Sequence, residues 1–349
     1  MSVICPRRLS VVVALTSAVW PIAGRADRQT LGLGGNFSQR LDRLFAAYSA
    51  GDDAVLRRSL TRPNDFPFDR NQLDEALRSW RRDWRPVRAM FLFDLMIRTS
   101  EIAPGSMTIV VPAAAAFMSS RPAGAPDPAL DLFESRWHRA TVAFLERFGE
   151  APWLQLYLDG IEGRFGTAGP RPAWLSFARA IALAQRCCPR ALYTPRRMSD
   201  ADAAIALFEA AARAPDRHDE SLVRGAMLQL QAGRAAEAFT LVDGASGALP
   251  DQELRYWRQM VRGLVFDALQ RPAEAADAYR GALEAWPQAH SASLRLASVY
   301  ARAGRMPDAV DLSLALVTAP RTAFDPWWAY DEADARFYAR WRAELVALK

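Results

Sequence analysis

The residues with the clearest chemical potential in this sequence are its few histidines and the acids near them. Three histidines occur, and none belongs to a zinc signature such as His-Glu-x-x-His: His138, His218 and His290. Glu134 and His138 lie four residues apart, so on one helix their side chains are close enough to pair. We interpret this pair as a structural hydrogen bond rather than as an acid and base.

The remaining candidate groups predict no catalytic residue, no cofactor and no metal. Cys187-Cys188 are adjacent, and a disulfide between neighbours closes a strained ring, so we expect two buried or half-buried thiols at a helix end. The glycine-rich run at 32–35 follows no predicted strand, and no Gly-x-Ser-x-Gly elbow occurs. The acid pairs Asp52-Asp53 and Asp74-Glu75 fall in turns or helix starts, where capping explains them.

Composition and charge exclude several classes of protein. Hydrophobic residues make up 51% of the 349 and charged residues 24%, which is typical of a folded chain. The 44 basic residues are all arginine except Lys349, and 39 acids oppose them to leave a net charge of +5. This balance disfavours nucleic acid as a partner, and three cysteines are too few for a disulfide scaffold.

The first 26 residues have the layout of a signal peptide. Arg7-Arg8 precede the apolar run 9–20, and the small residues Gly24 and Ala26 stand at the −3 and −1 positions of a cleavage site. The run is shorter than the roughly 20 residues that a membrane helix needs, and no later stretch is longer. We therefore predict a signal peptide at 1–26, no stable membrane span after its removal, and a periplasmic or secreted protein. An uncleaved anchor and a cytoplasmic leader are the alternatives.

A period of about 35 residues appears in the second half of the chain. Prolines recur at intervals of 33 to 37 residues, each after small and apolar residues at helical spacing: Pro215, Pro250, Pro287 and Pro320. Alanines recur ahead of them in the same register: Ala203, Ala238, Ala275 and Ala309. Small residues let two helices approach closely, and proline ends the second one, so the pattern predicts repeated helical hairpins.

The unit at 256–289 shows the pattern most fully, with a small and an aromatic residue before a turn and Ala, Tyr, Ala and Pro after it. Together with the units near 219–252 and 290–323, it resembles the tetratricopeptide repeat. The signature tryptophan of that repeat is missing, and other residues hold its positions: Leu222, Gln259 and Ser293. The resemblance implies an all-α solenoid of helical hairpins at 166–323, with an enlarged connection at 189–198 in its first unit.

The region 27–165 is predicted to be helical but irregular. Apolar residues recur at three- and four-residue spacing over 37–48, 72–100 and 130–148. Evidence for a strand is confined to Met107–Val111, within a long loop that we expect across 104–129.

The C-terminal segment 324–349 is predicted to end in a capping helix that covers the last repeat. That helix begins near Asp331, and its apolar residues fall on one side: Phe337, Tyr338, Trp341 and Leu345. A solenoid needs such a terminal element because its last repeat exposes an apolar face. Trp327-Trp328 have a second interpretation, as rings that stack on a sugar or a peptide.

The resemblance also implies a concave groove that binds another protein. Seven residues map toward it: Val223, Met227, Leu230, Trp257, Met260, Leu264 and Asp267. Members of the family that bind a C-terminal carboxylate use Lys and Asn at two of these positions, where this chain has Val223 and Met227. An apolar groove suits a hydrophobic peptide or a partner helix, unless the chain's own N-terminal half fills it. The oligomeric state stays open.

Two functions follow from these observations. The first is a non-catalytic protein–protein interaction scaffold, which rests on the repeats and on the lack of catalytic motifs. The second is a cell-wall glycan-binding protein or peptidoglycan-acting enzyme on a helical solenoid, which rests on exposed-looking Trp and Arg residues and on Glu134.

Overall fold

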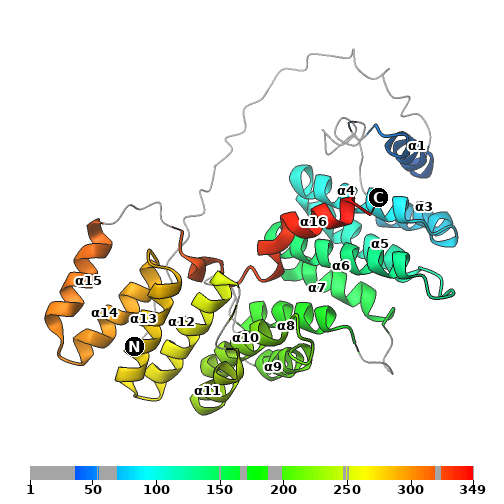
Figure 1. The fold of residues 1–349 in the computed structure, drawn as a ribbon. Helices are drawn as coiled ribbons and strands as arrows, with labels where there is room; N and C mark the ends of the chain where they lie inside the picture. Colours follow the sequence, from blue (N-terminus) through cyan, green and yellow to red (C-terminus); the bar gives the residue numbers. More distant parts are fainter. Residues whose placement is uncertain are drawn as a thin grey trace, which may run out of the picture.

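The computed structural model describes residues 36–52, 54, 69–148, 151–165, 171–187, 199–246, 249, 251–318 and 324–348. These residues form fifteen α-helices and three short 3-10 helices, with no strand among them (Figure 1). The predicted all-α fold of helical hairpins is confirmed. The proposed signal peptide and the connection at 189–198 lie outside the described residues, and none of the described helices is long and apolar enough to cross a membrane.

Six helices make up the N-terminal half: α1 (Phe37–Ser49), α3 (Arg70–Arg82), α4 (Pro86–Ile102), α5 (Met107–Ser119), α6 (Pro128–Phe148) and α7 (Ala151–Glu162). Their shared core contains large aromatic side chains, among them Trp80, Phe91 and Trp137. At the crossing of α5 and α7, a β-carbon on Gly160 would overlap the Ala115 side chain, so only glycine allows this close approach. The same core continues into α8 (Ala173–Cys187) and α9 (Ser199–Ala211).

The predicted strand at Met107–Val111 is wrong, because these residues open the helix α5. The run of β-branched residues suggested a strand, but α5 is buried between α4 and α7 and needs apolar residues all round. Pro112 lies in the second turn of α5, where it removes one backbone hydrogen bond without ending the helix. The expected loop at 104–129 is correspondingly reduced to a connection at 120–127.

Three further hairpins continue the array after α8–α9. They are α10–α11 (His218–Gln231 and Ala235–Gly244), α12–α13 (Gln252–Ala268 and Pro272–Ala285) and α14–α15 (His290–Arg302 and Met306–Thr318). In α12 the repeat needs a small residue at Gly263, because a β-carbon there would overlap the ring of Tyr279 from α13. A second hydrophobic core runs from α10 to α15. The two cores meet at α10, where Leu228 belongs to the first core and Val223 to the second.

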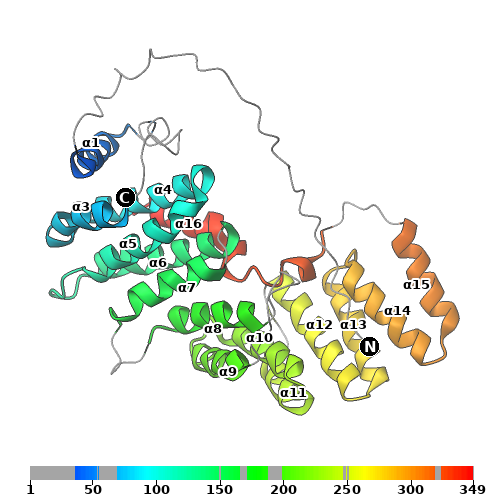
Figure 2. The ribbon, with the colours of Figure 1, turned by 180° about the vertical axis from the view of Figure 1, so that it is seen from behind.

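The C-terminal segment does not cap the last repeat, which corrects the sequence-based expectation. In this segment the described residues form 3-10 turns at Pro326–Ala329 (η2) and Asp334–Phe337 (η3), followed by the helix α16 (Tyr338–Val346). Both ribbon views show it crossing from the repeats back to the N-terminal half (Figures 1 and 2). There α16 packs on α6, with Trp341 and Leu345 in the first core. We call residues 324–337 the return segment.

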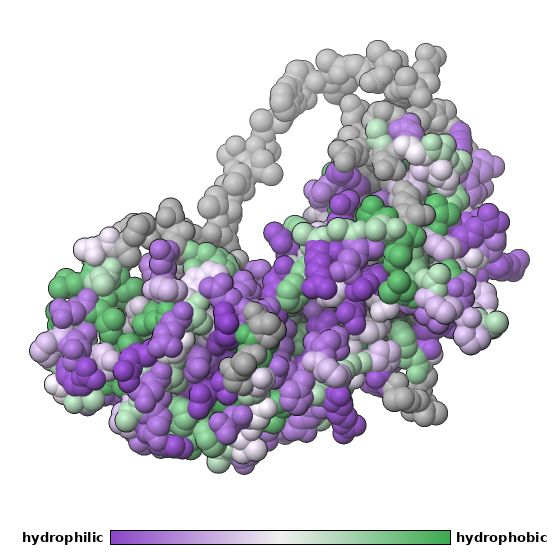
Figure 3. All heavy atoms as spheres, viewed as in Figure 1, coloured by the Kyte–Doolittle hydropathy of each residue, from purple (hydrophilic) through white to green (hydrophobic). Residues whose placement is uncertain are grey.

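The outer face of α15 is exposed as a consequence. Apolar side chains along it are 47–83% exposed: Met306, Val310, Leu314 and Val317. Figure 3 shows apolar atoms gathered over this end of the array, at the left of the view. An amphipathic helix such as α16 needs an apolar partner, and the sequence alone did not show which of the two candidate surfaces supplies it.

Candidate partner-binding groove

The structure divides the seven predicted groove residues into two groups. Val223, Trp257 and Met260 are fully buried in the second core. The others lie on the same helices, α10 and α12, and stay partly exposed: Met227, Leu230, Leu264 and Asp267. Asp267 accepts hydrogen bonds from Arg302 and Tyr279, so its carboxylate is already used within the array. Only part of the predicted stripe is therefore accessible.

The return segment packs on Trp257, one of the three buried residues of this stripe. The indole Nε1 of Trp257 donates to the carbonyl of Pro326 at 2.9 Å, and its ring meets Tyr330 edge to face at 5.3 Å. The sequence left open a groove filled by the N-terminal half, whereas the structure fills it with the C-terminal segment. The groove thus already holds a stretch of this chain.

Side chains of the array bind the return segment through its backbone carbonyls. Trp286 donates to the carbonyl of Phe324 at 3.1 Å, and Arg224 Nη1 donates to that of Tyr330 at 2.7 Å. The carbonyls of residues 325, 327 and 329 are bonded within the 3-10 turns. The array therefore engages the carbonyls of residues 324, 326 and 330. The stretch that makes these contacts forms the 3-10 turn η2, so the array holds a short turned segment rather than an extended one.

One side chain of the return segment enters the groove as a buried carboxylate. Asp325 is 0% exposed, and it accepts hydrogen bonds from the Tyr256 hydroxyl at 2.9 Å and from the backbone N–H of Ser291 at 2.7 Å. Ser291 lies in the first turn of α14, where the helix dipole favours a negative charge. Burial, together with the neighbouring Asp325 carboxylate, raises the pKa of Tyr256, so its hydroxyl remains a donor. The array thus accommodates a buried acidic side chain at this place.

A buried ion-pair network fixes the other end of the return segment. Arg217 pairs with Asp334 at 2.7 Å, and Arg336 pairs with Glu220 at 2.7 Å. Glu220 also accepts a hydrogen bond from Arg224 Nε at 2.9 Å. Burial lowers the pKa of Arg224, but the Glu220 carboxylate outweighs it and keeps that pKa above its ordinary value. The guanidinium that binds the Tyr330 carbonyl is thus held charged and oriented.

Glu146 joins the same network from α6. Its Oε2 accepts a hydrogen bond from the backbone N–H of Ala335 at 3.0 Å. Burial and then the nearby Asp334 carboxylate raise the pKa of Glu146 to about 8. A neutral carboxyl at this place avoids repulsion from Asp334.

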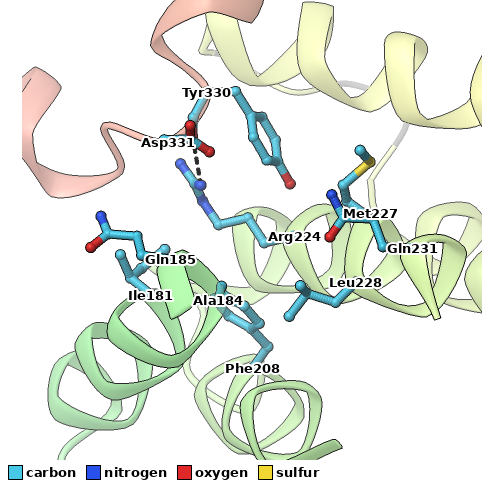
Figure 4. Close-up of a pocket in the computed structure, with 10 residues that line it drawn as sticks. All are labelled: Ile181, Ala184, Gln185, Phe208, Arg224, Met227, Leu228, Gln231, Tyr330 and Asp331. Carbon is cyan, nitrogen blue, oxygen red and sulfur yellow. Dashed lines mark hydrogen bonds between the residues drawn. The ribbon is translucent and has the colours of Figure 1, made fainter. Parts of the chain in front are cut away.

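A small cleft opens between α8, α10 and the return segment. Figure 4 shows Arg224 pointing to the return segment at Tyr330 and Asp331, with Met227 and Gln231 on the other wall. The cavity volume is about 40 Å³, which is enough for a water molecule or two. Small-molecule sites usually need roughly 300 Å³ or more, so this cleft is not a substrate pocket.

Glu134 and His138 form a buried structural cluster. Glu134 accepts hydrogen bonds from Arg121 and Arg164, and its Oε1 lies 3.6 Å from His138 Nε2. Burial would raise the pKa of Glu134, but its bonds with His138 and the arginines dominate and lower it to about 2. His138 stacks on Trp174 at 5.0 Å and is almost fully buried. A carboxylate held ionised and covered is unsuited to act as a general acid.

Two other possibilities considered from the sequence were metal ligation and stacking by the ring pair Trp327-Trp328. Within the described ranges, no group of three or more His, Cys, Asp and Glu side chains is placed to hold a metal ion. Trp327 is half-buried against Tyr330, and Trp328 is 44% exposed beside His290.

Sequence reasoning missed the polar groups that hold the return segment: Arg224, Tyr256, Trp286 and Asp325. The one local signal was Asp325 before Pro326, a combination typical of a turn start, which said nothing of a partner more than 30 residues away in sequence.

Comparison with known proteins supports the assignment of the repeats. Residues 260–326 match the family model described as Tetratricopeptide repeat, so the chain carries tetratricopeptide-type repeats in this region. The solved structure of MamA MSR-1 C2 is similar at 18% sequence identity, and the match covers 53% of this chain and 98% of that one. Its TM-score of 0.37 is too low for any property of that protein to be carried over. No curated protein matches the chain.

Proposed function

We propose that this protein is a non-catalytic protein–protein interaction scaffold, periplasmic or secreted, that binds a peptide or partner helix in the concave groove of α10, α12 and α14. The observation that carries the proposal is that side chains of the array bind the return segment through three of its backbone carbonyls and one buried carboxylate. Because the bound stretch is a 3-10 turn, those contacts favour a short turned peptide. Tetratricopeptide repeats are generally used for protein binding, which supports the same class.

The proposal is tested with the exposed groove residues, because Trp257 and Met260 are core residues whose loss would unfold the repeats. The full chain carrying Met227→Gln and Leu264→Gln is used to capture proteins from the extracytoplasmic fraction. Leu132→Gln is the matched control, since Leu132 is an exposed leucine on α6 in the other half. We expect a captured protein to be lost from the groove variant and kept by the control. Capture that both variants retain would contradict binding in the groove.

The proposed compartment rests on the pattern of residues 1–26 alone. The measurement is the N-terminal sequence of the protein recovered from cells. A chain that begins at Asp27 is the expected result, and one that begins at Met1 would remove the periplasmic or secreted assignment.

A further inference from the structure

The inward-facing residues of the return segment define a short recognition pattern. Asp325, Pro326 and Ala329 are buried, and Trp327 and Tyr330 are half-buried against α12, whereas Trp328 between them is 44% exposed. The pattern that meets the array is therefore Asp-Pro-Trp-Trp-Ala-Tyr, with the second tryptophan the most exposed of the six.

Each part of this pattern meets a separate group of the array. The carboxylate at the first position meets Tyr256 and the start of α14, the carbonyl of the second meets Trp257, and that of the last meets Arg224. The Arg224 guanidinium also lies over the Tyr330 ring at 4.8 Å. None of these contacts depends on the covalent links of the segment to α15 or α16, so a peptide from another chain can make all of them.

The covalent links nevertheless favour the chain's own segment. A tethered ligand has an effective concentration on the order of millimolar at its site, so a free peptide of the same sequence competes poorly. Binding in trans then requires that the return segment be weakened or that the partner bind more tightly than it does. The groove is in this sense held closed by its own ligand.

We infer that the groove recognises partner peptides with an Asp-Pro-aromatic pattern and that the return segment competes with them in cis. This inference rests on the proposed function, because it names the partner class and the regulation of the same groove. It commits to a peptide of a different protein as the occupant, because the contacts of the pattern all come from one turned stretch of residues 325–330, which a short peptide can supply.

The test uses the full chain and a fluorescent peptide with the sequence of residues 322–332. Asp325→Ala weakens the return segment and leaves every groove residue in place. We expect this variant to bind the peptide at least about tenfold more tightly than the unchanged chain, since a carboxylate with charge-assisted hydrogen bonds is lost from the competitor. Trp328→Ala, a change to the exposed ring of the same segment, is the matched control and is expected to behave like the unchanged chain.

Two further measurements identify the contacts. A peptide with its aspartate replaced by alanine is expected to bind the Asp325→Ala chain no more tightly than it binds the unchanged chain. The gain in affinity for the original peptide is also expected to disappear in the Asp325→Ala chain that carries Trp257→Phe, because this change removes the indole donor. Equal peptide binding by the unchanged chain and a folded Asp325→Ala chain would overturn the inference. A concentration-dependent dimer of the Asp325→Ala chain, in place of a one-to-one peptide complex, would assign the groove to a second copy and overturn it as well.

A second variant keeps the inference testable if Asp325→Ala does not fold. A protease site replaces residues 319–323, and the purified chain is cut there. A labelled peptide of residues 324–348 is expected to exchange into the cut chain, and a cut chain that stays folded without exchange over a day at 37 °C would overturn the inference. If exchange fails while capture still depends on Met227 and Leu264, the scaffold proposal stands with a different ligand.

Discussion

The two ends of the repeat array differ in what covers them. At the first end, α8–α9 shares a core with the N-terminal helices, and α16 adds Trp341 and Leu345 to that core. At the other end, α15 packs on α14 alone among the described elements with substantial contacts, and Val317 is 83% exposed. The C-terminal helix thus completes the N-terminal half and leaves the last repeat open. In a solenoid, the last sequence element need not be the last structural layer.

The largest effect expected from this difference is the loss of Trp341. Its ring is buried in the first core, and Arg136 and Arg139 lie over it at 5.5 and 5.2 Å. We expect Trp341→Ala to lower the free energy of unfolding by about 3–5 kcal/mol, the usual cost of removing a buried tryptophan. Leu314→Ala on α15 is the matched control at the open end, with an expected change within about 0.5 kcal/mol. Urea denaturation measures both, and equal costs would show that the two ends are covered alike.

The next effect concerns the ion pair that fixes the return segment. Asp334→Ala leaves the Arg217 guanidinium buried without its 2.7 Å partner. Breaking a buried pair in this way usually lowers the free energy of unfolding by about 3–5 kcal/mol. We expect a loss near the lower end of this range, because removing the Asp334 carboxylate also removes its repulsion of Glu146. The matched change is Asp308→Ala on α15, whose exposed pair with Arg305 is screened by water and is expected to contribute little to stability. Denaturation at neutral pH checks the two values, and a loss at Asp334 no larger than that at Asp308 would refute the role of the network.

Glu146 gives the same junction a pH dependence. Its pKa is about 8 in the folded chain, above its ordinary value of 4.5, so the unfolded chain releases this proton at lower pH than the folded chain does. The contribution of Glu146 to stability is present in full below pH 4.5 and is lost as pH rises toward 8. Glu146→Gln keeps an acceptor for the Ala335 N–H and does not ionise. We therefore expect its free energy of unfolding to fall less steeply with rising pH, and to exceed that of the unchanged chain by on the order of 1–2 kcal/mol at pH 8. Unchanged pH profiles of urea denaturation between pH 5 and 8 would contradict the assigned shift.

The parts of the fold that the sequence predicted are those set by local spacing. The hairpins of the array follow from alanines and prolines one repeat apart, and the helices of the N-terminal half follow from apolar spacing. The helix at 107–119 was missed because its β-branched residues favour a strand by their intrinsic preference. In the folded chain the burial of this segment on all sides favours a helix instead. The predicted groove residues lie on α10 and α12, but the sequence did not predict the segment that covers Trp257, because the pairing of Asp325 with Tyr256 is a long-range contact without a local signature.

The smallest expected effect lies in the turns of the open half, where the hairpins differ at one position. The second residue after the first helix has a positive φ in each hairpin: 80° at Gly233, 75° at Gly304 and 59° at Gln270. This left-handed conformation costs a residue with a β-carbon about 1 kcal/mol, whereas glycine adopts it freely. Gln270→Gly is therefore expected to stabilise the chain, by about 0.5 kcal/mol after the greater entropy of glycine in the unfolded chain is counted. Gly304→Ala is the reverse change in the last hairpin and is expected to destabilise by about 1 kcal/mol. Thermal unfolding measures both shifts, and a stabilising Gly304→Ala would show that the two turns are not equivalent.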